Sequence, residues 1–146
     1  MLGELGPARA ALERSLELSP EQSSTAFWLC LELLLEKKPA EALAAAHRST
    51  SETFRLAGEA MAHHHLGHEE EVRRLLAEMS AKYAIYQIAE VQAWLGDNDQ
   101  AFASLERARV QHDAGLIYTK GDPALRGLHG DPRWRALLEA LHLPVD

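Results

Sequence analysis

Apolar side chains recur along the chain with the period of an α-helix, in stretches that glycine and proline separate. One stripe, at offsets of 0, 3, 4 and 7, consists of Val72, Leu75, Leu76 and Met79. The same offsets recur near the end of the chain in Trp134, Leu137, Leu138 and Leu141. A stripe of this spacing forms one apolar face of a helix that must dock on the body of the protein. The pattern predicts helices over about residues 7–18, 24–36, 39–48, 68–80 and 82–95.

Capping signals predict two further helices. Ser49 and Glu52 have the spacing of a capping box, in which a side chain and a backbone donor satisfy each other, and they predict a helix that reaches His65. Asp97 and Gln100 have the same spacing and predict a helix that ends near residue 112.

The tail of the chain contains two Asp-Pro pairs, at residues 122–123 and 131–132. In each pair an acid suited to the N-cap precedes a proline suited to the first helical position. We therefore expect C-terminal capping helices within residues 122–142, and an irregular connection over residues 113–121.

Composition agrees with this pattern. Residues that favour helices dominate the 146-residue chain, whereas the β-branched and aromatic residues that favour strands are scarce. The length suits one domain with a real core. The sequence therefore predicts an all-α protein in a single domain, residues 1–146.

The predicted helices come in pairs, and a small residue early in each second helix marks the register: Ala8, Ala42, Val72 and Ala101. These anchors are spaced near the 34 residues of a tetratricopeptide repeat, with two intervals somewhat shorter. In the last repeat, the positions that fit the small and large pattern are Ile85, Ile88, Ala89, Gln92, Gly96, Ala101, Leu105 and Ala108. In the preceding repeat Glu59 occupies an apolar position, and in the one before that Lys37 replaces the turn glycine.

Around these anchors the chain resembles the tetratricopeptide repeat family, and its tail is similar to segments that follow such repeats in bacterial regulatory proteins. The resemblance implies a right-handed solenoid of helical hairpins, with about three and a half repeats and a C-terminal capping helix. The half repeat covers residues 7–20, and full repeats cover 23–50, 53–80 and 82–112. A plain helical bundle is the alternative.

The resemblance also implies where a partner binds, because the first helices of such repeats line a concave face. The positions that point into this face include Phe27, Leu31, Leu34, Phe54, Met61, His64, Tyr83, Tyr86 and Glu90. This surface is apolar and aromatic with one carboxylate, and it suits an extended or helical segment with hydrophobic anchors. The alternative is that these side chains pack against the chain itself or against a second subunit.

Charge and cysteine content narrow the class of partner and the compartment. A formal net charge of −7 repels a phosphate backbone and an anionic membrane surface, so we expect neither nucleic acid nor membrane as a partner. The single cysteine, Cys30, lies in an apolar run and is expected to be a buried free thiol. With no secretory signal or apolar run of membrane-spanning length, a cytoplasmic chain is expected.

Four histidines, His63, His64, His65 and His68, form the one cluster suited to a metal, and His64 and His68 are one helical turn apart. Adjacent histidines point in different directions around a helix, and His63 occupies a packing position of the repeat. We therefore expect no metal site and no cofactor. The sequence contains no recognisable catalytic pair or phosphate loop, so no enzymatic activity is expected.

Two functions follow from these patterns. The first is a protein-interaction module, either free-standing or the regulatory part of a longer signalling or transcription protein. The second is a self-association module, since the first helix has no preceding hairpin partner and its apolar positions need a cover. We expect a homodimer on this ground.

Overall fold

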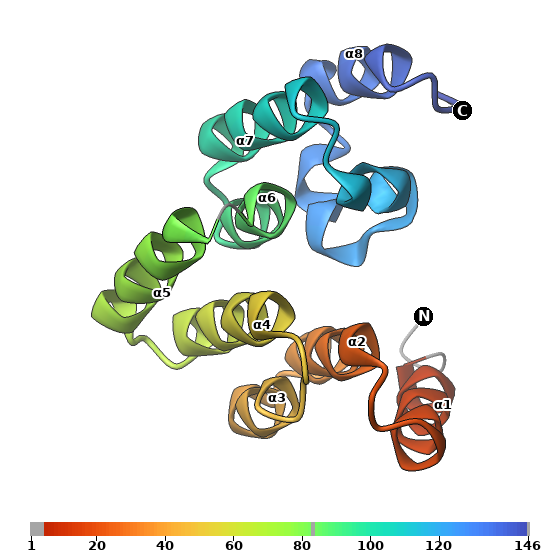
Figure 1. Cartoon of the computed structure of the whole chain (residues 1–146), viewed down its shortest axis with the longest axis vertical. Coiled ribbons are helices and arrows are strands. Elements are labelled where there is room, and N and C mark those ends of the chain that lie inside the picture. The colour runs from red at the N-terminus through yellow and green to blue at the C-terminus, as the bar shows by residue number, and fades with distance from the viewer. Residues whose placement is uncertain (1–4, 83, 146) are drawn as a thin grey trace. The chain divides into compact units, whose positions relative to one another are not determined.

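The computed structural model describes residues 5–82 and 84–145, and within them all regular secondary structure is helical (Figure 1). This confirms the predicted all-α class. No helix of these residues is both long enough and apolar enough to cross a membrane.

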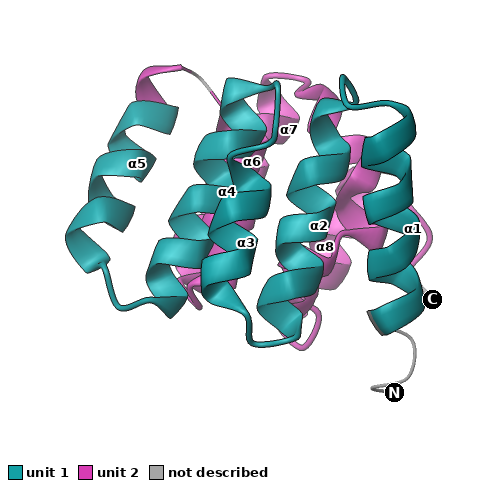
Figure 2. Cartoon of the chain, turned by 90° about the horizontal axis from the view of Figure 1, so that it is seen from below, with its two compact units in different colours: residues 1–79 teal, residues 80–146 magenta. Residues whose placement is uncertain are grey.

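The chain divides into two compact units, residues 1–79 and 80–146 (Figure 2). The division falls within a helix that the sequence assigns to one repeat. The first unit contains α1 (Leu5–Leu18), α2 (Ser23–Leu35), α3 (Pro39–Ala46), α4 (Glu52–His65) and most of α5 (Glu69–Ala81). Consecutive helices from α1 to α4 pack on one another, and α2 also packs on α4. The single domain that we expect from the sequence stays a prediction.

The second unit begins with α6 (Ile85–Trp94), which pairs with α7 (Asn98–Val110). Two 3-10 helices follow, η1 (Ala114–Gly121) and η2 (Pro123–Leu128), and both pack on α6. The chain then forms α8 (Pro132–Ala140). The buried core of this unit consists of Tyr86, Ala89, Ala93, Ala101, Leu105, Leu125, Leu128, Trp134, Leu137 and Leu138.

The predicted stripe of the last helix is confirmed. Three of its members, Trp134, Leu137 and Leu138, belong to the buried core, and Leu141 packs against it from a half-buried position. Asp131 caps the helix by accepting a 2.9 Å hydrogen bond from the backbone N–H of Arg133.

Among the described residues, five helix ends share one backbone conformation, and three of them end the first helices of the predicted hairpins. Lys37, Gly67 and Gly96 each follow the last turn of a helix with positive φ angles of 61°, 77° and 81°. At each end two backbone N–H groups close back on the helix, as in a Schellman motif; for example, Lys38 N donates to Leu33 O at 2.9 Å. Lys37 therefore takes the conformation of the glycine that it replaces.

The helix that ends at His65 starts differently from our prediction. Its N-cap is Ser51, whose Oγ accepts from Phe54 N, and not Ser49. Ser49 Oγ instead donates to Ser23 O at 2.8 Å, so this hydroxyl ties the start of α2 to the loop before α4. The predicted Ser49–Glu52 capping box is therefore wrong.

The predicted irregular connection over residues 113–121 is also wrong. Most of it forms η1, which Asp113 caps by accepting a 2.8 Å hydrogen bond from Gly115 N. Asp122 caps η2 in the same way through Ala124 N, as the Asp-Pro pair predicts. In the helix predicted over 82–95, the structure starts α6 only at Ile85 and ends it at Trp94.

Candidate functional site

Most residues predicted to line a concave binding face have no access to solvent. Those that are buried are Phe27, Leu31, Leu34, Met61, Tyr86 and Glu90. Phe54 and His64 are half-buried, and Tyr83 lies outside the described residues. The open apolar surface that we expected is therefore absent at these six positions in this conformation. That any of the nine contacts a partner stays a prediction.

In the first unit, the buried aromatic side chains pack against each other. The ring of Phe27 lies 5.4 Å from that of Trp28 and 5.5 Å from that of Phe54, measured between centroids. Cys30 is buried nearby on the same helix, where its thiol lies 3.6 Å from Gly58 O, and burial raises its pKa to about 12. These contacts give α2 and α4 a shared interior, as expected for a structural role of the thiol.

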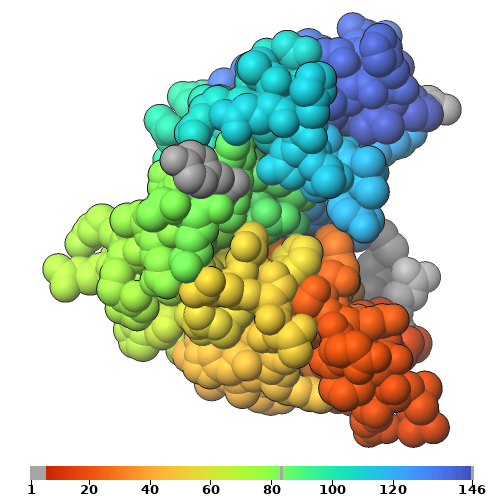
Figure 3. Space-filling model, viewed as in Figure 1, coloured from red at the N-terminus to blue at the C-terminus, as the bar shows by residue number. Residues whose placement is uncertain are grey.

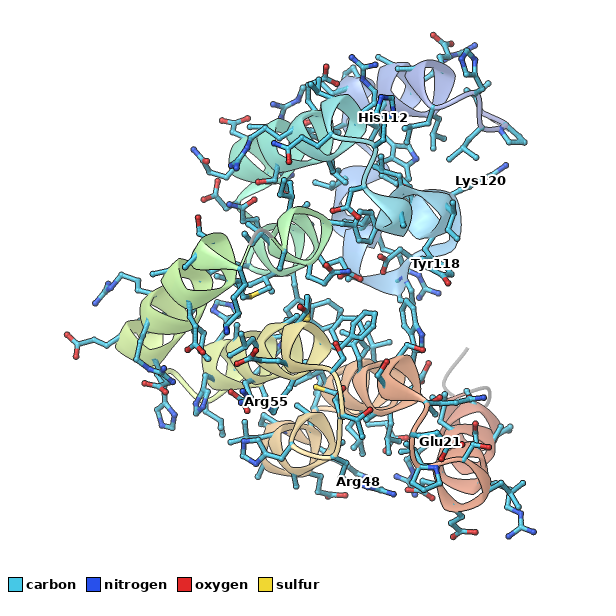
Figure 4. The ribbon with its side chains drawn as sticks, viewed as in Figure 1. Glu21, Arg48, Arg55, His112, Tyr118 and Lys120 are labelled. Carbon is cyan, nitrogen blue, oxygen red and sulfur yellow. The ribbon has the colours of Figure 1, made fainter. Side chains whose placement is uncertain are left out.

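Glu59, the acid at an apolar repeat position, is buried with partners. Its Oε1 accepts from Arg55 Nη1 at 2.7 Å and lies 3.2 Å from His47 Nε2. The guanidinium and the imidazole compensate for the loss of water around this carboxylate. Arg55 is marked on α4 in Figure 4. The acid therefore departs from the repeat pattern without leaving an unpaired charge in the interior.

The histidine that lies next to His68 is not His64, the residue that the sequence places one helical turn away. His63 Nδ1, and not that of His64, lies 3.0 Å from His68 Nδ1, and the two rings border a shallow hollow of about 520 Å³. His64 Nδ1 lies 3.3 Å from Glu69 Oε1 but outside hydrogen-bonding geometry. Burial lowers the pKa of His63 and also that of His65. Within residues 5–82 and 84–145, no three His, Cys, Asp or Glu side chains are placed to hold a metal ion.

A second polar cluster lies inside the second unit, around Tyr86. The Tyr86 hydroxyl donates to Asp122 Oδ2 at 2.8 Å, and Tyr86 N donates to Asp113 Oδ2 at 3.3 Å. Gly115 lies against the ring so closely that a Cβ there would be 2.5 Å from Tyr86 Cγ. Burial, with the nearby Asp122 carboxylate, raises the pKa of Tyr86 far above its ordinary range. The tyrosine thus joins α6 to the residues that start η1 and η2.

Glu90 belongs to the same cluster and is 2% exposed. Burial raises its pKa well above the ordinary value, and the neighbouring Asp122 and Asp113 raise it further. Glu90 Oε2 is buried and has no hydrogen-bond partner. Because solvent does not reach this carboxyl group, its neutral form is favoured.

Two exposed apolar side chains on η1 were not predicted from the sequence. Ile117 is 73% exposed and Tyr118 is 55% exposed. The segment that carries them lies at the surface in Figure 3, in light blue, and Figure 4 marks Tyr118 and Lys120 on it. Their signal in the sequence was the run of large apolar residues 116–118 inside a stretch without helical period. Other large apolar side chains that are exposed include Leu18, Leu35, Val110 and Val145.

No family model matches the chain, and neither a curated protein nor a solved structure matches it.

Proposed function

We propose that this chain is a tetratricopeptide-like module that binds a polypeptide segment. The regular placement of its helical hairpins supports a repeat array. The positive-φ turns that end the first helix of each predicted hairpin, at Lys37, Gly67 and Gly96, are 30 and 29 residues apart; two further positive-φ residues, His112 and His142, follow later helices. The small residues that mark the second helices, Ala42 and Ala101, are fully buried. In repeat arrays each hairpin buries its apolar face on its neighbour, and the remaining surface is available to partners.

The observation that carries the proposed binding function is the exposed pair Ile117 and Tyr118. Adjacent large apolar side chains at the surface are favourable contacts for another protein, and tyrosine is among the residues that contribute most to such interfaces. The predicted groove is a poorer candidate, because six of its nine side chains are buried. We therefore place the proposed contact on η1.

We propose also that the chain catalyses no reaction by itself. In the second unit, the carboxyl groups of Glu90 and Asp122 and the hydroxyl of Tyr86 form a cluster of acid-base groups. All three residues are buried, so a substrate has no path to them in this conformation. Their hydrogen bonds connect α6, η1 and η2, which suits a structural role.

The test is selection of binding peptides from a random library on the purified chain, followed by affinity measurement with variants. We expect the double variant Ile117→Ser/Tyr118→Ser to bind the selected peptide at least tenfold more weakly, a loss of about 1.4 kcal/mol. The control is Val110→Ser, which removes an apolar side chain that is 63% exposed on α7 and should leave affinity unchanged. Failure to select any peptide, or equal affinity of the double variant, would contradict the proposal.

The alternative function is self-association, in which the occupant of the same surface is a second copy of the chain. It predicts a dimer that the double variant converts to monomer. A dimer that survives the double variant would show that another surface holds the two copies.

A further inference from the structure

Glu90 is placed so that its protonation state affects how the segment of residues 113–128 docks on α6. Tyr86 and Glu90 are four residues apart and share one face of α6. Both η1 and η2 pack on this helix. Asp113 caps η1 and Asp122 caps η2, and both acids also accept hydrogen bonds from Tyr86 on α6.

The groups around Glu90 favour a neutral carboxyl. On its own helix, Tyr86 lies close enough to interact electrostatically with Glu90, and from the docked segment Asp122 and Asp113 contribute negative charge. No basic side chain is among the groups that shift Glu90. Glu90 is also buried, and its Oε2 has no hydrogen-bond partner. An ionised Glu90 would be a buried, uncompensated charge beside two other carboxylates, which is strongly unfavourable.

The hydrogen bonds of Asp122 decide which of the two carboxyl groups carries the proton. Asp122 Oδ2 accepts from the Tyr86 hydroxyl at 2.8 Å, and Asp122 Oδ1 accepts from Ala124 N at 2.9 Å. Both oxygens of Asp122 therefore act as acceptors. Asp122 therefore has the hydrogen bonds of an ionised carboxylate, which leaves Glu90 as the carboxyl group that carries the proton.

We propose that a proton on Glu90 holds residues 113–128 on α6, and that the loss of this proton at higher pH weakens the docking of the segment. The device is a switch within the second unit, and it does not depend on the function proposed above.

The sign follows from proton linkage. The folded state binds this proton more tightly than the unfolded state, because the pKa of Glu90 is raised on folding from an ordinary value of 4.5. The stabilisation is therefore complete below pH 4.5 and is lost as the pH rises toward the folded-state pKa. One proton changes the unfolding equilibrium constant by at most tenfold per pH unit.

The decisive variant is Glu90→Gln, which keeps the shape and the donor of the protonated side chain but cannot ionise. Denaturant unfolding of the wild-type chain and the variant should be measured from pH 5 to pH 8. We expect the wild-type unfolding constant to rise relative to that of the variant by up to tenfold per pH unit. The variant should therefore be the more stable protein at pH 8.

The matched control is Glu106→Gln on α7. Glu106 is exposed and its pKa is lowered by the Arg109 hydrogen bond, so it stays ionised over the whole range and should not alter the pH slope. The histidines are the same in all three proteins, so their contribution cancels when the pH dependence of the unfolding constant is compared between proteins. Equal pH slopes for wild type and Glu90→Gln, or a Glu90→Gln protein that is less stable at every pH, would overturn the proposal.

Amide hydrogen exchange of the wild-type chain gives a second test, which also serves if Glu90→Gln does not fold. After correction for the intrinsic pH dependence, protection of residues 113–128 should fall with rising pH relative to protection of α7. A constant ratio between the two segments from pH 5 to pH 8 would refute the switch.

Discussion

Replacing Gly115 by alanine should destabilise the second unit strongly. The added Cβ would lie 2.5 Å from Tyr86 Cγ, 2.6 Å from Cδ1 and 2.9 Å from Cβ. These atoms are the root of the side chain and not its flexible end, and the hydroxyl at the far end is fixed to Asp122. The ring therefore cannot move away without losing its hydrogen bond or shifting α6.

We estimate the cost at about 3 kcal/mol, the upper part of the range for overpacked cores. For a chain of this length that corresponds to a fall in Tm of roughly 6–12 °C. Denaturant unfolding followed by far-UV circular dichroism measures the free energy, and a thermal melt measures the Tm.

Gly121 is the matched control, because it lies on the same 3-10 helix and a Cβ there meets nothing within 4 Å. Gly121→Ala should be neutral or slightly stabilising, since alanine lowers the entropy of the unfolded chain. Combining Gly115→Ala with Tyr86→Leu should cost less than the sum of the two single changes, because the smaller side chain relieves the clash. Equal stabilities of Gly115→Ala and Gly121→Ala would refute this account of the packing.

Three further predictions concern the other parts of the chain. Gly67→Ala should lower the free energy of unfolding by about 1 kcal/mol, because alanine disfavours the φ of 77° at this position. Lys37→Gly should raise the free energy of unfolding by about 0.5 kcal/mol, because glycine adopts the φ of 61° without strain. Denaturant melts in which Gly67→Ala is as stable as the wild type, or Lys37→Gly is less stable, would contradict the assigned turns. The Cys30 thiol, with a pKa of about 12, should not react with Ellman's reagent at pH 8 until the chain unfolds, and rapid native labelling would show that it is accessible. If the chain self-associates, light scattering at micromolar concentration should report about twice 16.2 kDa, and a clean monomer would exclude dimerisation under those conditions.

The sequence by itself determined the helical class and most helix ends, because these depend on residues close together in the chain. Asp97, Asp122 and Asp131 cap the helices that they precede, as their spacing predicted. The apolar stripe that begins at Trp134 likewise predicted that the last helix docks on the core. The sequence pattern predicted that Lys37 lies at a turn, but it did not predict the left-handed backbone conformation of this residue.

Only the tertiary structure decided which apolar and polar side chains are buried and which hydroxyl caps a helix. Ser49, with Glu52 three residues later, matches the capping-box pattern and Ser51 does not, but the Ser49 hydroxyl donates to Ser23 O, 26 residues earlier in the chain. Glu90 was predicted at a binding surface, but it is buried, and this burial, together with Asp122 32 positions later, raises its pKa. Periodicity places a side chain on a face of its helix, but contacts between distant segments determine whether that face meets solvent, a neighbouring carboxylate or the core.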